Sequence, residues 1–215
     1  MVRFWMVGIA VALAACGPDD PGTPPEPLSH DEEAIRDADG TVLFHRDSLP
    51  DEVAVSEGST FGSSGQITGV AGPSVAGRVA FTSVGVAHGY GWLLDPGVEA
   101  TPVLAVFQYG GEVEVVGWDD SGRFAAFKVE TPAGSSELRI TDTEATGPYP
   151  EDRTRPVTLP EAEELSPEVR IYEDPEWEEG ALCFTFHGDR RCLDPETAET
   201  GRSGTPEVSA PAPGP

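Results

Sequence analysis

The clearest secondary-structure pattern in the chain is the segment Val103-Leu104-Ala105-Val106-Phe107-Gln108-Tyr109-Gly110-Gly111-Glu112-Val113-Glu114-Val115-Val116. Two runs rich in β-branched and aromatic residues, which favour strands, lie on either side of a Gly-Gly pair. Glycine readily adopts the positive φ angles that a primed two-residue turn requires. The segment therefore predicts a β-hairpin in which Leu104, Val106, Val113 and Val115 share one face.

Short apolar runs and turn residues alternate along the rest of the chain as well. Asp39-Gly40 separates Ala34-Ile35-Arg36 from Thr41-Val42-Leu43-Phe44-His45, which predicts a second hairpin. Prolines at 156, 160, 167 and 175 interrupt the acidic stretch 151–179, so we expect at most one short helical turn, near Glu161 to Leu165. The 25 Gly and 21 Pro also disfavour long helices. We expect an all-β fold of short antiparallel hairpins and meanders.

Cys183 and Cys192 flank a third predicted hairpin. A two-residue turn at His187-Gly188 places these residues opposite one another: Phe186 and Asp189, Thr185 and Arg190, Phe184 and Arg191, Cys183 and Cys192. Counted outward from the turn, the cysteines form a non-hydrogen-bonded pair, whose Cα spacing of about 4.5 Å suits a disulfide. We expect this disulfide. The alternative, a redox or metal-binding pair, lacks the Cys-x-x-Cys spacing.

The N-terminus carries the most specific signal in the sequence. Arg3 precedes a 12-residue apolar run from Phe4 to Ala15, which is too short to span a bilayer but fits the h-region of a signal peptide. The run ends in Leu13-Ala14-Ala15-Cys16, which resembles the lipobox of bacterial lipoprotein signal peptides. The resemblance implies cleavage before Cys16 and acylation of that cysteine with chains such as palmitate. The alternative is a plain secretory signal in which Cys16 is incidental.

The lipobox defines an expected domain organisation. We expect a signal peptide (1–15), a tether of lipidated Cys16 and Pro-rich residues (16–30), a β domain (31–200) and a disordered tail (201–215). An extended Pro-rich tether spaces a domain from the bilayer by about 3.1 Å per residue. The implied location is the bacterial cell envelope, anchored to a membrane on its periplasmic or outer-membrane face.

One segment of the β domain resembles a known repeat. Trp118-Asp119-Asp120-Ser121-Gly122-Arg123-Phe124-Ala125-Ala126-Phe127, followed by residues 137–147, is similar to a blade of the TolB or WD40-like β-propellers. Residues 76–97, 177–197 and 35–45 are weaker copies, and 45 residues, a normal blade period, separate Gly77 from Gly122. The resemblance implies a small propeller-like domain.

Chain length limits this resemblance to at most four blades, because each blade needs roughly 40–45 residues. Three architectures remain open at this point. They are a four-bladed propeller, an open array of blades completed by a partner, and a β-sandwich whose hairpins only look like blades.

The charge of the chain argues against two classes of partner. With 13 Lys+Arg and 38 Asp+Glu the formal net charge is −25. Such a surface repels phosphate backbones and anionic lipid headgroups, which disfavours nucleic-acid binding and electrostatic attachment to membranes. Attachment through acyl chains does not depend on surface charge. The expected partners are therefore the bilayer, through Cys16, and an unidentified envelope protein or polymer.

No catalytic, cofactor or metal motif stands out. The sequence lacks a Gly-x-Ser-x-Gly elbow, a Gly-x-Gly-x-x-Gly loop and a His-Glu-x-x-His pair. Asp37-Ala38-Asp39-Gly40 is a poor calcium loop, because Ile35 and Arg46 fall on its first and twelfth ligand positions. No cofactor and no metal are expected.

Two function classes follow from these observations. The first is a non-catalytic binding module that contacts its partner through a blade face, with exposed Tyr90, Trp92 and Trp118 as candidate anchors. Near them lies His88, among glycines that either let a ligand approach the backbone or form a Gly-rich loop between strands with a surface His, which is the favoured interpretation. The alternative is an extracytoplasmic hydrolase with an unidentified carboxylate site.

Overall fold

A computed structural model describes residues 27–96, 101–196 and 200–202, and over these ranges the fold is all-β. The helical segments are short, namely η1 (Arg46–Ser48), η2 (Pro150–Asp152), α1 (Pro160–Glu163) and η3 (Pro167–Val169). The strands are β1 (Ser29–His30), β2 (Ala34–Arg36), β3 (Val42–His45), β4 (Glu52–Ser56), β5 (Ser59–Gly62), β6 (Gln66–Ala71), β7 (Val79–Val84), β8 (His88–Leu94), β9 (Val103–Tyr109), β10 (Glu112–Trp118), β11 (Phe124–Glu130), β12 (Ser136–Asp142), β13 (Thr154–Pro156), β14 (Tyr172–Glu178), β15 (Ala181–Phe186), β16 (Asp189–Leu193) and β17 (Thr200–Arg202).

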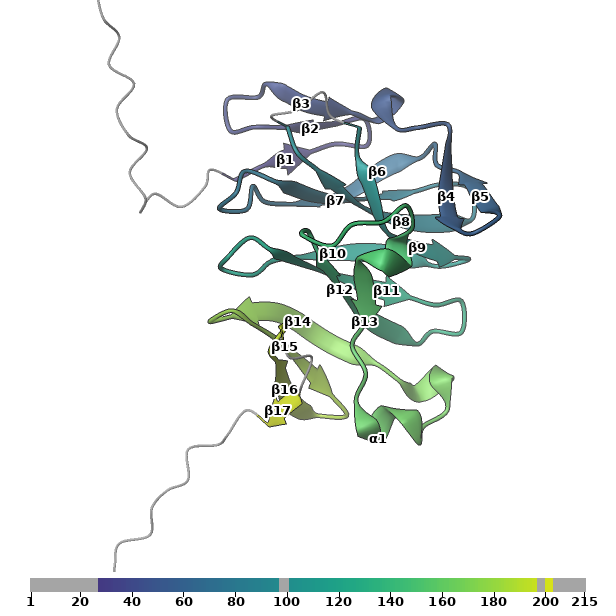
Figure 1. Cartoon of the computed structure of the whole chain (residues 1–215), viewed down its shortest axis with the longest axis vertical. Coiled ribbons are helices and arrows are strands. Elements are labelled where there is room, and N and C mark those ends of the chain that lie inside the picture. Colours follow the sequence, from purple (N-terminus) through teal and green to yellow (C-terminus); the bar gives the residue numbers. More distant parts are fainter. Residues whose placement is uncertain (1–26, 97–100, 197–199, 203–215) are drawn as a thin grey trace, which may run out of the picture.

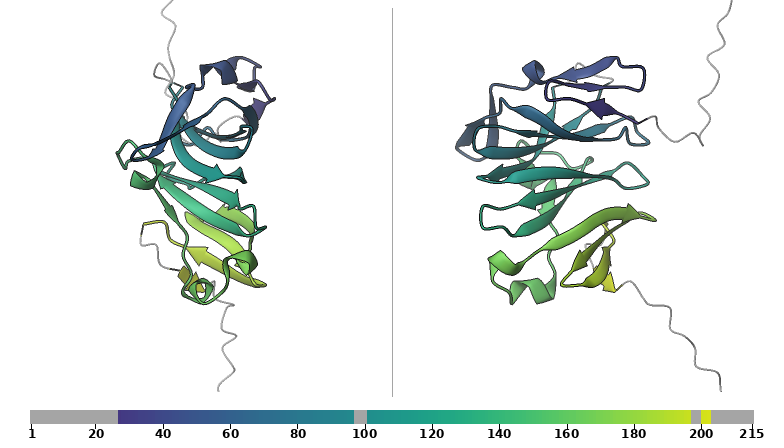
Figure 2. Two further views of the ribbon diagram at one scale, coloured as in Figure 1. Left: turned by 90° about the vertical axis from the view of Figure 1, so that its right-hand side faces the viewer. Right: turned by 180° about the vertical axis from the view of Figure 1, so that it is seen from behind.

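These strands form antiparallel meanders that follow the chain order. The sheets are β1-β2-β3, β6-β7-β8-β9, β10-β11-β12-β13 and β14-β15-β16-β17, with β4-β5 as a separate hairpin. The sheets lie one above the other in chain order, and the hairpin stands at one side (Figure 1). Seen from two further sides, the β1–β3 and β14–β17 sheets remain at opposite ends (Figure 2). The described array is therefore an open stack.

Three apolar layers hold the stack together, one between each pair of successive sheets. The first layer joins Ile35 and Phe44 to Phe81 and Trp92, among others. The second layer joins the β6–β9 sheet to the β10–β13 sheet, and the third joins that sheet to β14–β17. The two middle sheets have a neighbouring sheet on both faces, so their inner strands β7, β8 and β11 are buried at successive positions instead of alternate ones.

The segment 103–116 forms two strands and a tight connection, but the predicted hairpin is wrong. β9 pairs with β8, and β10 pairs with β11 in the next sheet. Gly110-Gly111 thus connects one sheet to the next. A Cβ on Gly111 would lie 1.9 Å from the carbonyl oxygen of Glu130, so this position has no room for a side chain. Leu104 also faces the first layer, whereas Val106 and Val113 face the second. β9 has apolar residues on both faces, and β10 alternates Glu with Val, so neither pattern identifies the partner strand.

Other local predictions are confirmed, with one exception. β2 pairs with β3 across Asp39-Gly40. The Pro-interrupted acidic stretch contains α1 near the predicted helical turn, but it also contains the 3-10 turn η3, so it has more than the one helical turn predicted. β15 and β16 pair in the predicted register, with positive φ at His187 (51°) and Gly188 (81°). Cys183 and Cys192 form the disulfide, with their Cα atoms 4.0 Å apart.

Each predicted repeat copy corresponds to part of one sheet. β7 and β11 begin at Val79 and Phe124, which preserves the 45-residue spacing, and Ser121-Gly122 connects β10 to β11. The degenerate copy 177–197 lies in the β14–β17 sheet, and 35–45 lies in β1–β3. Thr146-Gly147, however, does not end its repeat, since β13 follows as a fourth strand.

The described strands run from β1, which begins at Ser29, to β17, which ends at Arg202. The signal peptide, Cys16, most of the tether and most of the tail lie outside the described residues. Among the helices that the structure describes, none has the length and apolar character needed to cross a membrane.

The acidic run 173–179 is mostly strand. It lies in β14, at the edge of the last sheet, where a bulge between Glu173 and Glu176 contains Asp174 (φ 46°) and Pro175. The edge strands β6 and β10 also carry bulges. Bulges, charges and Pro on an edge strand oppose pairing with another chain. Part of the negative charge thus protects sheet edges.

Candidate functional site

The structure corrects the expectation that Tyr90 and Trp92 are exposed. Both side chains are fully buried in the first apolar layer. The Trp92 Nε1–H donates to Ser83 Oγ at 2.8 Å, and the Tyr90 hydroxyl donates to the Gly62 carbonyl at 2.6 Å. Burial also raises the pKa of Tyr90. Neither side chain is available to a partner, because the β1–β3 sheet and the β4-β5 hairpin cover this face of β8.

Trp118 lies apart from these two residues and has a different role. It is half-buried and packs against the second apolar layer. Its Nε1–H donates to the Ala71 carbonyl at 3.2 Å, which joins the ends of β10 and β6. The structure therefore does not bring the three predicted aromatic anchors together on one surface.

The glycines around His88 accommodate the neighbouring sheet. A Cβ on Gly89 would lie 2.8 Å from the Val113 backbone nitrogen, and one on Gly91 would lie 2.9 Å from the Phe127 ring. Both positions face the β10–β13 sheet. The absence of side chains there lets two sheets approach closely, so the glycines serve packing between sheets and do not open the backbone to a ligand.

A different aromatic group does reach the surface. Phe61 on β5, His88 on β8, and Phe107 and Tyr109 on β9 form what we call the rim cluster. The Phe61 ring lies 4.7 Å from Phe107 and 5.0 Å from His88, and the His88 ring lies 4.8 Å from Tyr109. Tyr109 is 65% exposed, while the other three side chains are partly buried. The cluster is thus a packed aromatic platform with one exposed ring.

Neighbouring polar groups fix the strand end that carries this platform. Arg139, from β12 of the next sheet, donates through Nη1 to the Phe107 carbonyl at 3.0 Å. The Gln108 side-chain amide donates to the Tyr109 carbonyl at 3.0 Å. The Nδ1 atom of His88 is buried without a hydrogen-bond partner in the described part of the chain, so aromatic contacts hold its ring. An ordered aromatic surface loses little side-chain entropy on binding.

Sequence reasoning missed the rim cluster because it depends on strand pairing. His88 lies opposite Tyr109 only because β8 pairs with β9. The hairpin predicted from Gly110-Gly111 paired β9 with β10 instead. The sequence does contain one signal for the cluster. Phe107 and Tyr109 are two positions apart in a predicted strand, so their side chains lie on the same face.

The structure also contains an acidic cleft of about 470 Å³ between the β6–β9 and β10–β13 sheets. His30, Glu112, Glu114 and Glu130 line it, and all four are exposed. Carboxylates that act as general acids usually acquire their altered pKa through burial. The one buried carboxylate among the described side chains is Asp119, which accepts a hydrogen bond from the Phe124 backbone N–H at 2.7 Å and stabilises a turn.

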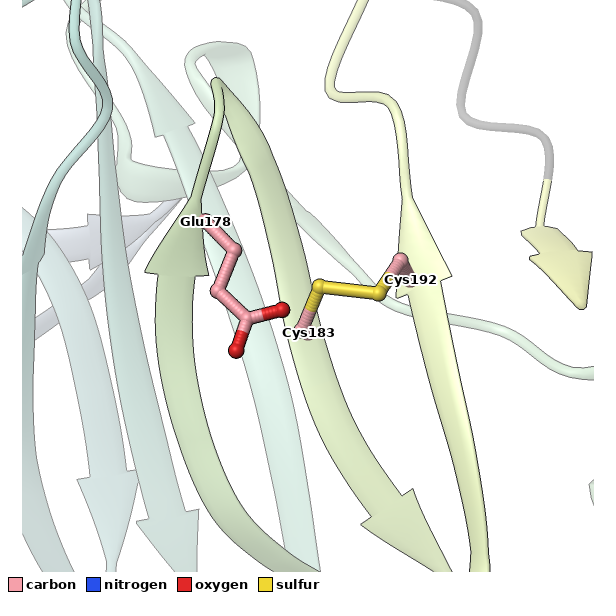
Figure 3. A group of neighbouring side chains, drawn as sticks. All are labelled: Glu178, Cys183 and Cys192. Carbon is pink, nitrogen blue, oxygen red and sulfur yellow. A yellow bond between two sulfur atoms is a disulfide. The ribbon is translucent and has the colours of Figure 1, made fainter. Parts of the chain in front are cut away.

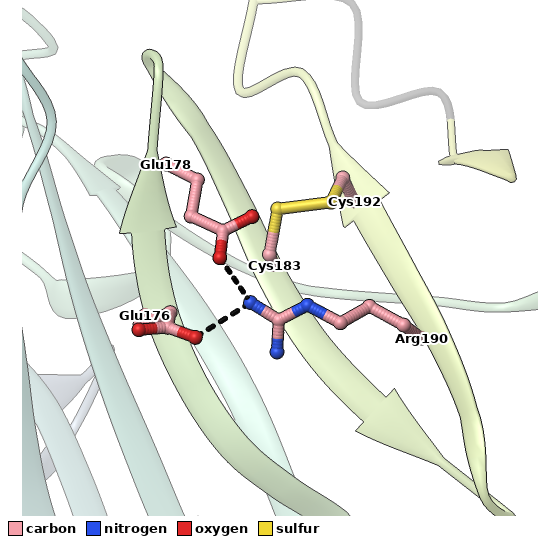
Figure 4. Close-up of a disulfide and its surroundings, with 5 residues drawn as sticks. All are labelled: Glu176, Glu178, Cys183, Arg190 and Cys192. Carbon is pink, nitrogen blue, oxygen red and sulfur yellow. Dashed lines mark hydrogen bonds and ion pairs between the residues drawn. A yellow bond between two sulfur atoms is a disulfide. The ribbon is translucent and has the colours of Figure 1, made fainter. Parts of the chain in front are cut away.

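One group of potential metal ligands is brought together among the described residues. Glu178, Cys183 and Cys192 place their ligand atoms within 4.8 Å of one another (Figure 3). The two sulfur atoms are joined as a disulfide, and Arg190 pairs with both Glu176 and Glu178 at 2.6 Å (Figure 4). In this oxidised form the sulfurs do not offer thiolates.

Comparison with protein-family models, with curated proteins and with solved structures finds no significant match to this chain.

Proposed function

We propose that this protein is a lipid-anchored binding module of the bacterial cell envelope, held to a membrane through acylated Cys16. The proposal of an anchor rests on Leu13-Ala14-Ala15-Cys16, on the short apolar run before it and on the Pro-rich segment after it. The acidic domain is repelled by anionic headgroups, so a Pro-rich tether would hold it away from the bilayer surface.

The observation that supports binding over catalysis is the contrast between the rim cluster and the carboxylates. The rim cluster offers an exposed Tyr109 on a rigid aromatic base, and aromatic residues of this kind dominate binding energy at interfaces. The cleft carboxylates, in contrast, are exposed, and buried Asp119 accepts hydrogen bonds within a turn. We propose that the rim cluster is where an envelope protein or polymer binds.

Crosslinking in intact envelopes tests this assignment. A photoreactive amino acid at position 109 is expected to capture a defined partner, while the same group at position 75 is expected to capture none. Val75 is a matched control because it is 69% exposed and lies in the β6–β7 connection, at the opposite end of that sheet from Tyr109. Equal crosslinking from both positions, or none from position 109, would show that the rim cluster is not the binding surface.

A further inference from the structure

We propose that Cys183, Cys192 and Glu178 form a binding site for a thiophilic divalent metal ion, of the zinc or cadmium class, when the disulfide is reduced. The site lies on the face of the last sheet that points away from the stack, because Leu182, Phe184 and Leu193 fill the opposite face. Reduction would thus replace the disulfide between Cys183 and Cys192 by a set of three metal ligands, namely these two cysteines and Glu178.

The register of the sheet supplies the geometry. Cys183 lies opposite Cys192 on one side and opposite Glu176 on the other, while Glu178 follows two positions later on the same face of β14. Two sulfurs and an oxygen bound to one tetrahedral zinc ion lie about 3.3–3.8 Å apart. The ligand atoms already lie within 4.8 Å of one another. Side-chain rotation can therefore separate the sulfurs and bring in the carboxylate while the strands stay in place.

The charges around the site also fit a divalent cation. Two thiolates, Glu178 and Glu176 carry four negative charges, against which a divalent ion and the Arg190 guanidinium place three positive charges. Arg190 at present bridges Glu176 and Glu178 at 2.6 Å each. When Glu178 turns to the metal, Arg190 can keep its ion pair with Glu176, and the one remaining negative charge lies among exposed residues. Three protein ligands leave a fourth position to water.

A dithiol is one class of reductant that can open the disulfide. Its thiolate attacks Cys192 Sγ, the cysteine with the more exposed side chain, and breaks the bond to Cys183 Sγ. The second thiol of the reductant then displaces Cys192 and closes a disulfide in the reductant. Two electrons and two protons pass to the protein, which leaves two thiols, and metal binding releases both protons.

Cadmium titration tests the proposal in the full chain. The chain carries Cys16→Ser, so that Cys183 and Cys192 are its only thiols, and a phosphine reduces it. We expect a thiolate-to-cadmium charge-transfer band that saturates at one ion per chain, and no such band in the oxidised protein. Glu178→Gln is expected to weaken binding at least about tenfold. Glu173→Gln, on the same strand but outside the ligand group, is expected to leave binding unchanged.

Two results would overturn the proposal. One is the absence of a saturable charge-transfer band from the reduced chain. The other is equal cadmium affinity in Glu178→Gln and Glu173→Gln, because binding by the thiols alone, including binding by a chain that unfolds on reduction, would not distinguish these carboxylates. Far-ultraviolet circular dichroism of the reduced protein reports whether the sheet persists.

Discussion

Replacing Trp92 with alanine is expected to lower the free energy of unfolding by about 3–5 kcal/mol. The indole is fully buried, stacks on Phe81 with ring centroids 6.1 Å apart and on Tyr90 at 5.8 Å, and donates to Ser83. Its removal would leave a cavity between two sheets and a buried hydroxyl without its donor. A loss of this size is a large part of the stability of a domain of this length.

Chemical denaturation checks this expectation by comparing the free energy of unfolding of Trp92→Ala with that of Tyr109→Ala. Tyr109 is 65% exposed, so its replacement is expected to change stability by no more than about 0.5 kcal/mol. The reverse order, with Trp92→Ala near neutral and Tyr109→Ala strongly destabilising, would mean that the apolar layers are assigned to the wrong side chains.

Replacing Cys16 with alanine is expected to abolish fatty-acid labelling and to move the protein from the membrane fraction to the soluble fraction. Acyl chains contribute about 0.8 kcal/mol of membrane affinity per buried CH₂ group, and two chains give stable anchoring. No other feature is expected to replace them, because the chain carries a formal charge of −25 and the apolar run 4–15 is too short to span a bilayer.

The matched control for this experiment is Cys183→Ala in the same cells. It removes a cysteine of the disulfide but leaves the lipobox intact, so labelling and membrane association are expected to persist. Continued labelling of Cys16→Ala would contradict the lipobox interpretation.

Local sequence patterns predicted the turns at Asp39-Gly40 and His187-Gly188 and the disulfide, because each depends on neighbouring residues. His187-Gly188 fixed the register of β15 and β16, and that register placed Cys183 opposite Cys192. The repeat spacing was also visible, since Val79 and Phe124 begin equivalent strands of successive sheets.

The partners of β9 and β10 could not be predicted in the same way. Gly110-Gly111 resembles a hairpin turn, but the space around Gly111 is set by the backbone of Glu130 and that around Gly110 by the Pro132 ring, both distant in sequence. The error in pairing had a consequence for the site. It separated His88 from Tyr109, which the pairing of β8 with β9 brings together. Tyr90 and Trp92, the predicted anchors, lie under a neighbouring sheet, which the sequence does not reveal.

The mass of the N-terminal peptide of the protein extracted from membranes tests the central claim, anchoring in the envelope, most directly. The proposal predicts a peptide that begins at Cys16 and carries a diacylglyceryl group on the sulfur, with residues 1–15 removed. A peptide that retains residues 1–15, or one that begins at or after Cys16 without a lipid, would contradict it.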